Sequence, residues 1–138
     1  MVKDDCIFCK LANKVIPTVS LYEDDDFRVI LDAGPASRGH ALILPKQHYQ
    51  NLCELDEVVG AGVLKVAAKL GKAMISGLGC AGFNLVQNNG EAAGQTVMHF
   101  HMHVIPRYKD GPEMVAWKPG SVTTEEAERI AEAVKSQL

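Results

Sequence analysis

His99-Phe100-His101-Met102-His103-Val104-Ile105 repeats histidine at every second position. Successive side chains of a β-strand point to opposite faces, so the three imidazoles would share one face and the apolar residues between them the other. Neighbouring imidazoles would then lie roughly 6.5 Å apart, close enough to act on one ligand in different ways. A helix would scatter the same side chains around its axis. The β-branched Val104 and Ile105, followed by Pro106, favour a strand that stops at this proline.

The remaining histidines strengthen the argument for a functional site. The chain has five histidines, and the two outside this stretch, His40 and His48, lie eight residues apart in one segment. A strand whose polar face simply met water would carry Lys, Thr or Glu as readily as His. The concentration of imidazoles therefore indicates a shared chemical role.

Length and composition indicate one ordinary globular domain, residues 1–138. The net charge of −3 lacks the basic excess of proteins that bind nucleic-acid polymers. The charged start of the chain is followed by no secretory apolar core, and no apolar run approaches the roughly 20 residues that span a membrane. We therefore expect a soluble, cytoplasmic protein whose four cysteines are thiols or metal ligands, not disulfides.

Strand patterns recur along the chain and predict an antiparallel sheet. The acidic turn 24–26 between two apolar segments is typical of a hairpin, and the loops 32–39 and 88–96 are rich in Gly and polar residues. With the histidine strand the total is five, and the expected strands before it are Val19–Glu23, Phe27–Leu31, His40–Pro45 and Gly82–Gln87.

Helical spacing of apolar residues predicts one long helix over Asp56–Ser76, capped by Asp56 and ended by Gly77. Its glycines lower helix propensity, and close packing against another element or a second subunit would explain Gly60, Gly62 and Gly71. A capping box at Thr123 begins a C-terminal helix that would bury Ala127, Ile130, Ala131 and Val134. With a short helix or turn near Cys6–Asn13, the fold class is α+β: a five-stranded antiparallel sheet, one long central helix and a C-terminal helix.

An ordered set of short motifs accompanies the histidines. They are Cys6-x-x-Cys9, Ile16-Pro17, the Asp32 loop, Gly39-His40-Ala41, Pro45-Lys46-x-His48, Asn88-x-Gly90 and Gly94-Gln95-Thr96. With the pattern His-φ-His-φ-His-φ-φ, where φ is apolar, the chain resembles the histidine triad (HIT) family from residue 6 to about residue 108. The resemblance implies a five-stranded antiparallel sheet with two helices that usually forms a homodimer. It also implies a HIT-type nucleotidyl hydrolase that binds a purine nucleotide.

The resemblance assigns the catalytic roles. A neutral imidazole is a competent nucleophile near pH 7 when its other nitrogen donates to a fixed acceptor. In similar proteins the residue that corresponds to His101 attacks the α-phosphorus of a nucleotide, and water hydrolyses the resulting nucleotidyl-histidine. His103 and His40 would donate to the non-bridging oxygens. Thr96 would act toward the leaving group, although strand propensity alone also explains a threonine there.

The expected nucleotide contacts have simpler alternative explanations as well. Asp32 resembles the acid that accepts from the ribose hydroxyls, Asn88 resembles a residue at the sugar–phosphate region, and Gln95 would contact phosphates. Asp32 and Asn88 are also ordinary turn residues. The apolar residues that match the purine pocket, and that core packing would equally explain, are Ile7, Phe8, Leu11 and Ile16. Trp117 would help to close the site or a dimer.

Cys6 and Cys9 alone are ambiguous, because a redox pair would need a preceding strand and only five residues precede Cys6. Some bacterial relatives resemble this chain in using such a pair with two histidines, here His48 and His99, to bind structural zinc. We expect Zn²⁺ at these four residues and no catalytic metal, with free thiols as the alternative. Cys53 and Cys80 are expected to be small buried residues.

Three functions remain open at this point. The first is cleavage at the α-phosphorus of purine nucleoside phosphoramidates or similar AMP conjugates, with dinucleoside polyphosphates as alternative substrates. The second is a catalytic metal held by the three histidines, although three ligands in a row on one strand are widely spaced for one ion. The third is a purine-nucleotide sensor. Arg107 after Pro106 resembles the polyphosphate branch, because Gly-Gly commonly follows the triad in phosphoramidases.

Overall fold

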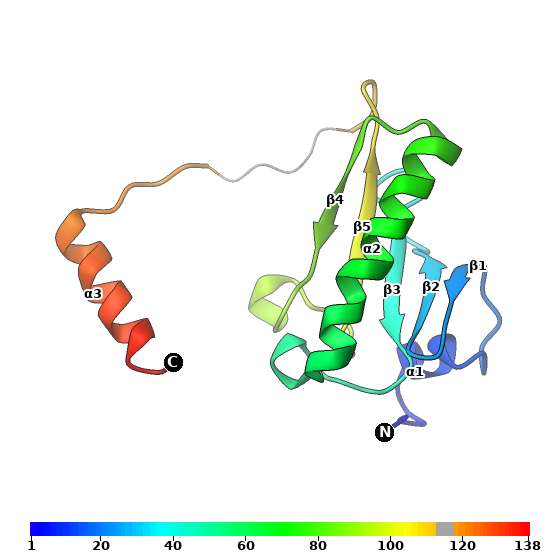
Figure 1. Cartoon of the computed structure of the whole chain (residues 1–138), viewed down its shortest axis with the longest axis horizontal. Helices are drawn as coiled ribbons and strands as arrows, with labels where there is room; N and C mark the ends of the chain where they lie inside the picture. Colours follow the sequence, from blue (N-terminus) through cyan, green and yellow to red (C-terminus); the bar gives the residue numbers. More distant parts are fainter. Residues whose placement is uncertain (113–117) are drawn as a thin grey trace.

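The structure is a computed structural model that describes residues 1–112 and 118–138 (Figure 1). Trp117 lies outside the described residues. No described helix is both long enough and apolar enough to cross a bilayer. The elements are α1 (Ile7–Ala12), β1 (Ser20–Glu23), β2 (Phe27–Leu31), β3 (Ala41–Pro45), the 3₁₀ helix η1 (Leu52–Glu54), α2 (Glu57–Leu78), β4 (Gly82–Val86), the 3₁₀ helix η2 (Glu91–Ala93), β5 (Met102–Arg107) and α3 (Thr124–Lys135).

The strands form one antiparallel sheet in the order β1-β2-β3-β5-β4, which confirms the predicted α+β fold. The helix α2 crosses one face of this sheet (Figure 1). Val29 and Ile43 pack in the core beneath α2, whereas their neighbours Ile30 and Leu42 belong to a second cluster with residues of α1. Because alternate side chains of a strand point to opposite faces, α1 covers the face opposite α2.

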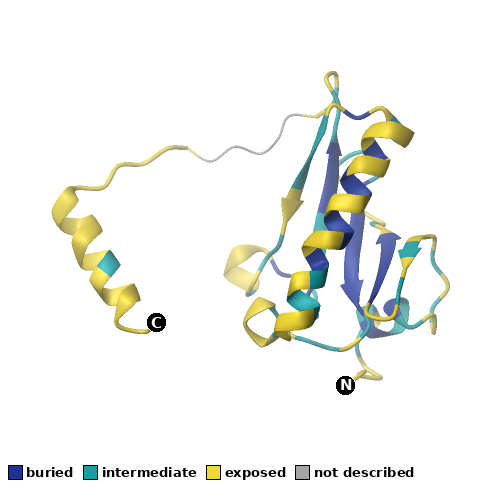
Figure 2. Ribbon diagram, in the orientation of Figure 1, coloured by how far each residue is buried: buried dark blue, intermediate teal, exposed yellow. Residues whose placement is uncertain are grey.

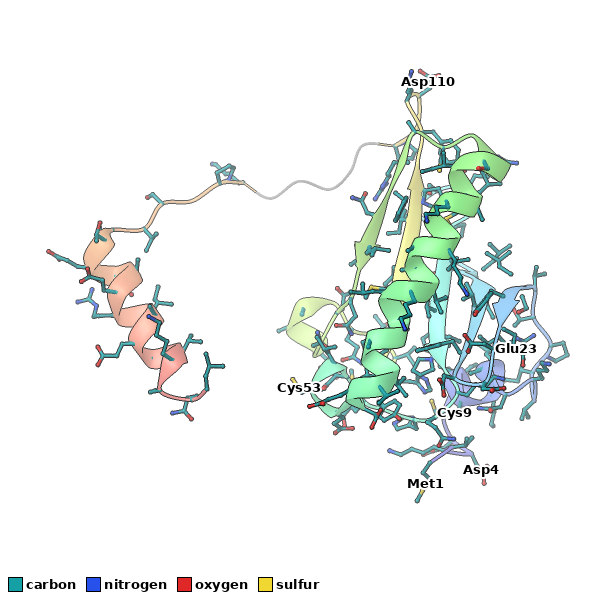
Figure 3. All side chains as sticks on the ribbon, viewed as in Figure 1. Met1, Asp4, Cys9, Glu23, Cys53 and Asp110 are labelled. Carbon is teal, nitrogen blue, oxygen red and sulfur yellow. The ribbon has the colours of Figure 1, made fainter. Side chains whose placement is uncertain are left out.

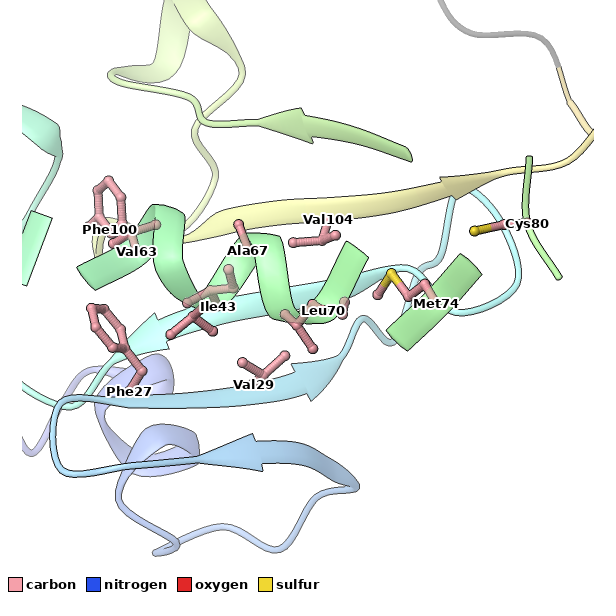
Figure 4. Close-up of a cluster of buried hydrophobic side chains, with 12 residues drawn as sticks. Phe27, Val29, Ile43, Val63, Ala67, Leu70, Met74, Cys80, Phe100 and Val104 are labelled. Atoms are coloured by element: carbon pink, nitrogen blue, oxygen red, sulfur yellow. The ribbon is translucent and has the colours of Figure 1, made fainter. Parts of the chain in front are cut away.

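The main core lies between α2 and the sheet (Figures 2 and 4). Asp56 caps α2 as predicted, since its carboxylate accepts from the backbone N–H groups of Val58 and Val59. The helix ends later than predicted: Gly77 stays helical, and Gly79 ends the helix at a φ of 67°, in the left-handed region that glycine enters at little cost.

Two glycines of α2 are required by close packing. A Cβ at Gly62 would lie 2.8 Å from Cε2 of Phe27, and one at Gly71 would overlap the ring of Phe83. A Cβ at Gly60 would make only an ordinary contact with Leu55. The close approach expected at Gly62 and Gly71 is confirmed, and it occurs within one chain.

The strand β5 differs from its prediction at both ends. It begins at Met102 and passes through Pro106 to Arg107. The carbonyl of Pro106 accepts from the hydroxyl of Ser37, so the backbone polar groups of this proline point toward β3, which begins only at Ala41. The missing N–H of Pro106 therefore removes no ladder hydrogen bond, and the strand continues.

The C-terminal helix α3 forms as predicted but is not buried. Thr123 caps it by accepting from the N–H of Glu126. Its apolar face was expected to pack on the domain, yet Ile130 is 51% exposed and Val134 is 55% exposed. In Figures 1 and 2 the helix lies apart from the sheet, and nearly all of it is exposed. Amphipathic spacing predicted the helix correctly, whereas it carries no information on which surface covers the apolar face.

Candidate functional site

The histidines of the triad share one side of the sheet, as their spacing predicts. Phe100 and Val104 are buried in the core beneath α2. His99 and His101 instead meet Phe8 of α1, the second at 4.9 Å between ring centroids. These two histidines precede β5, so the alternation of side chains begins before the regular strand.

His101 is held in the form that a nucleophile needs. It is 6% exposed, and its Nδ1 lies 2.7 Å from the backbone carbonyl of His99. A carbonyl only accepts hydrogen bonds, so Nδ1 carries the proton and donates. In the neutral ring, Nε2 is then unprotonated and has its lone pair available.

The contacts of His40 and His103 fix both tautomers, and they direct the proton of His40 to His103 and not to the phosphate oxygen expected from the sequence. The N–H of Ala36 donates to Nδ1 of His40 at 2.9 Å, so the proton of the neutral His40 ring is on Nε2. That Nε2 lies 2.9 Å from Nδ1 of His103 and donates to it. His103 therefore has its own proton on Nε2, where it can donate to a ligand.

The same contacts decide between donor and metal-ligand roles for this group. Asp32, His40 and His103 have ligand atoms within 4.8 Å of one another, a spacing that a metal ion could also use. A metal on Nε2 of His40 would require a proton on Nδ1, where the N–H of Ala36 already donates. The hydrogen bonds therefore favour a donor role.

Asp32 serves both the turn and the histidines. One of its carboxylate oxygens accepts from the N–H of Gly34 at 2.8 Å, as the turn interpretation expects. The other lies 3.4 Å from Nε2 of His40 and 3.8 Å from Nδ1 of His103. Its position at the rim of the site is compatible with the expected ribose contact.

Burial keeps the three imidazoles neutral near pH 7. It lowers the pKa of His40 and of His101, although the charge of Asp32 opposes the shift in both. Burial, reinforced by the neighbouring rings of His101 and His40, lowers the pKa of His103 to about 4. His40, His101 and His103 are thus in their uncharged forms near pH 7.

A cavity of about 280 Å³ opens beside these histidines. It includes six of the predicted site residues: Phe8, Leu11, Asp32, Thr96, His101 and His103. Ile7 and Ile16 are not among its lining residues, and Ile7 is 50% exposed. The lining residues that sequence reasoning missed are Thr18 and the apolar Ile30, Leu31, Ala33 and Leu42. Alternation along β2 and β3 places Ile30 and Leu42 on this face and could have identified them.

The loop before the triad brings Thr96 to the cavity, whereas the side chain of Gln95 forms hydrogen bonds with the backbone of the loop and of Gln50. Gln95 is 2% exposed. Its amide donates to the carbonyls of Gln50 and Val97, and its oxygen accepts from the N–H of Gly90. Because its donors and its acceptor are already paired within the protein, Gln95 supports the loop and has no free donor for the phosphate contact expected from the sequence. Asn88, expected near the sugar and phosphate, does not line the cavity and faces the carbonyl of Gly94.

The four predicted metal ligands come together at the end of the histidine row. Nδ1 of His99 lies 3.4 Å from Sγ of Cys6 and 3.5 Å from Sγ of Cys9. Nδ1 of His48 lies 3.5 Å from Sγ of Cys9. Tetrahedral zinc with bonds of about 2.3 Å to sulfur and 2.0–2.1 Å to nitrogen requires sulfur–nitrogen distances of about 3.5 Å.

The protonation of His99 also fits a metal ligand. Its Nε2 lies 3.0 Å from the carbonyl of Pro45 and must donate to it, which leaves Nδ1 unprotonated toward the two thiols. The residues therefore match a Cys₂His₂ zinc site.

The two other cysteines are separate from this cluster. Cys80 is buried in the main core, as expected. The prediction for Cys53 was wrong, since this thiol is exposed on η1 (Figure 3). Its short helix is held by the side chain of Asn51 and has no buried residues, which the sequence around Cys53 does not reveal.

Comparison with known proteins places the chain in a family. A family model described as HIT domain matches residues 13–110. The adenylylsulfatase HINT3 of Arabidopsis thaliana is 43% identical over 106 residues, which are 77% of this chain and 54% of that protein. The chain thus spans about half the length of this relative. The adenosine 5'-monophosphoramidase hnt1 of Schizosaccharomyces pombe is 36% identical over 134 residues, which are 96% of this chain and 98% of that protein.

A solved structure extends the similarity to the fold. The crystal structure of a zinc-bound histidine triad family protein from Mycobacterium smegmatis is 35% identical with a TM-score of 0.76, and the match covers 96% of this chain and 94% of that one. The histidine row, the fold and the extent of these matches agree, and the chain belongs to the HIT domain family.

Proposed function

We propose that this protein cleaves AMP conjugates, such as purine nucleoside phosphoramidates, at the α-phosphorus through a nucleotidyl-histidine intermediate. The observation that carries the proposal is the unprotonated Nε2 of His101 beside the cavity, together with the Nε2–H of His103, whose tautomer is fixed by His40. The names of the adenylylsulfatase and phosphoramidase relatives support a hydrolase that acts on nucleotides.

The chemistry proceeds in two displacements. The lone pair on Nε2 of His101 attacks the α-phosphorus, the bond to the leaving group breaks, and that group departs with the bonding electrons. Nε2–H of His103 donates to a non-bridging oxygen, and His40 holds His103 in the tautomer that can do so. The departing group takes up a proton from solvent. Water then attacks the same phosphorus and gives up a proton to solvent, the phosphorus–nitrogen bond breaks, and AMP leaves while the bonding electrons return to His101 as its lone pair. Thr96 lines the cavity beside the histidines, and we assign its hydroxyl the role toward the leaving group that the family resemblance implies.

Zinc at Cys6, Cys9, His48 and His99 forms part of the proposal. Four protein ligands would fill its coordination, so the ion would supply structure and no open position for water. Because His99 also contributes the carbonyl that orients His101, the cluster would fix the start of the chain beside the nucleophile. A homodimer and a cytoplasmic location, both expected from the sequence, remain proposals.

The test is AMP release from adenosine 5'-phosphoramidate, followed by chromatography, for the native protein and His101→Ala. We expect the variant to lose at least about a thousandfold in kcat/KM, because it lacks the attacking atom. AMP binding by calorimetry is the control for an intact site. Residual activity near that of the native protein would rule out the nucleophile assignment.

A nucleotide sensor is the second candidate, since the same cavity would serve binding without turnover. Tight AMP binding together with no cleavage of any AMP conjugate would favour it.

A further inference from the structure

A polar pair lies beside the histidines on the sheet face that carries them. Arg107 follows His103 by four residues on β5, so its side chain projects from the same face. Asn84 of β4 pairs with Ile105, and its side-chain oxygen accepts a hydrogen bond of 2.8 Å from Nε of Arg107. The pair extends the row of imidazoles toward β4.

The hydrogen bond turns Arg107 back toward the triad. Asn84 is level with Ile105, which is halfway between His103 and Arg107 along β5. Diagonal neighbours on adjacent strands are about 7–8 Å apart, so an arginine that bonds Asn84 leans toward the histidines. The charge of Arg107 is also one cause of the lowered pKa of His40, which places the guanidinium within electrostatic reach of the site.

The terminal donors of Arg107 have no protein partner among residues 1–112 and 118–138. Within this part of the chain its side chain makes only the Nε bond to Asn84 and no ion pair. Arg28 differs, because its terminal nitrogens donate to the carbonyls of Leu11 and Thr18. A half-buried guanidinium with free planar donors is suited to two oxygens of a phosphate or sulfate.

The cavity and Arg107 lie on opposite sides of the triad. The cavity is lined by residues of β2 and β3, whereas Arg107 leans over β4, which borders β5 on its other edge. A nucleoside in the cavity with its α-phosphate at the histidines would direct any group beyond that phosphate away from β3 and toward β4.

We propose that Arg107, held by Asn84, binds an anionic group joined to the α-phosphate. The protein then favours conjugates whose leaving group carries its own phosphate or sulfate oxygens. This inference rests on the proposed function and specifies its substrate class.

The test compares AMP with ADP, whose β-phosphate stands for such a leaving group, by calorimetric binding. All proteins carry His101→Ala so that no turnover occurs. We expect ADP to bind about tenfold more tightly than AMP, and Arg107→Gln to abolish that preference. Asn84→Ala should reduce the preference in part, because the arginine keeps its charge and loses its support. Lys109→Gln also removes one positive charge, but at an exposed position, and should keep the preference for ADP.

Kinetics with His101 restored separates the two possible sources of the anion. Arg107→Gln should lower kcat/KM for diadenosine triphosphate or adenylyl sulfate about tenfold relative to kcat/KM for adenosine 5'-phosphoramidate. The larger loss identifies whether phosphate or sulfate is the preferred group. An unchanged ADP preference in Arg107→Gln, or equal loss of AMP and ADP binding, would overturn the inference. Absence of cleavage with an intact ADP preference would refute the proposed function alone.

Discussion

At the residue scale, fixed backbone groups set the protonation of His99, His101 and His40, and His40 in turn sets that of His103. The carbonyl of His99 accepts a hydrogen bond from Nδ1–H of His101, and the carbonyl of Pro45 accepts one from Nε2–H of His99. The N–H of Ala36 donates to Nδ1 of His40, which therefore carries no proton. Identical side chains thereby take the protonation states that the proposed roles of nucleophile, metal ligand and donor require. Their shared face was predictable from their spacing, whereas their tautomers depend on contacts with distant segments.

Ala36→Pro tests this control of protonation, because it removes the N–H that bonds His40 and leaves every site side chain in place. We expect kcat to fall about tenfold with little change in KM. Without this N–H the tautomer of His40 is no longer fixed, and His103 loses the orientation with which it would stabilise the transition state. Steady-state kinetics on adenosine 5'-phosphoramidate measures the effect. Ala36→Gly retains the N–H and should remain near native activity; equal losses in both variants would contradict the assignment.

The lowered pKa of His103 predicts a loss of stability in acid. Its pKa is about 4 in the folded protein and ordinary, near 6.5, in the unfolded chain, which therefore binds more protons between these values. The free energy of unfolding should thus fall as the pH drops from about 7 to 4, by up to about 3 kcal/mol from this group. Urea unfolding across that range compares native protein with His103→Gln. The variant should show a shallower decline, and parallel curves would refute the shift.

At the element scale, the start and the apolar face of α2 could be predicted from the sequence, whereas its end and its close packing could not. Its apolar spacing and the Asp56 cap were readable from sequence, because both are local. Its end at Gly79 was missed, because Gly77 and Gly79 differ in backbone conformation and not in residue type. The sequence did not predict that β5 continues through Pro106. It can continue because the backbone of Pro106 faces β3, and β3 begins too late in the chain to pair with this residue.

Gly71→Ala should destabilise the protein by about 1–2 kcal/mol, since the clash with Phe83 exceeds the gain in helix propensity. Gly77→Ala is the matched control. A Cβ there has no neighbour within 4 Å, so it should stabilise by up to about 1 kcal/mol. Chemical denaturation measures both changes, and equal effects would show that propensity alone governs these sites.

Cys9→Ser should lower both the zinc content and the melting temperature, because it removes a thiolate ligand from a site that joins α1 to the triad segment. Metal analysis and thermal unfolding follow the two quantities. Cys53→Ser changes an exposed thiol outside the cluster and should alter neither. Unchanged zinc content in Cys9→Ser would refute the site.

At the scale of the whole molecule, the sheet brings segments from both ends of the domain to one face. The N-terminal helix, the loop before β3 and the triad segment meet there, and family motifs predicted their residues before any contact was known. The cavity wall was predicted less well, because Ile7 and Ile16 differ from Phe8 and Leu11 only in their position relative to the sheet.

The exposed apolar side chains of α3 bear on the proposed homodimer. Ile130 and Val134 are half exposed, and no described part of the chain covers that face. Light scattering should give a mass of about twice the chain's 14.9 kDa at micromolar concentration. A mass equal to one chain would contradict the homodimer.

The central claim is that His101 forms the covalent intermediate, and trapping that intermediate tests it most directly. Adenosine 5'-phosphoramidate is mixed with the native protein, quenched rapidly in alkali, and the digest is analysed by mass spectrometry. We predict an adenylyl group on His101 that appears before AMP and disappears as AMP is released. An adduct on another residue, or AMP formed in the first turnover with no adduct on His101, would contradict the account.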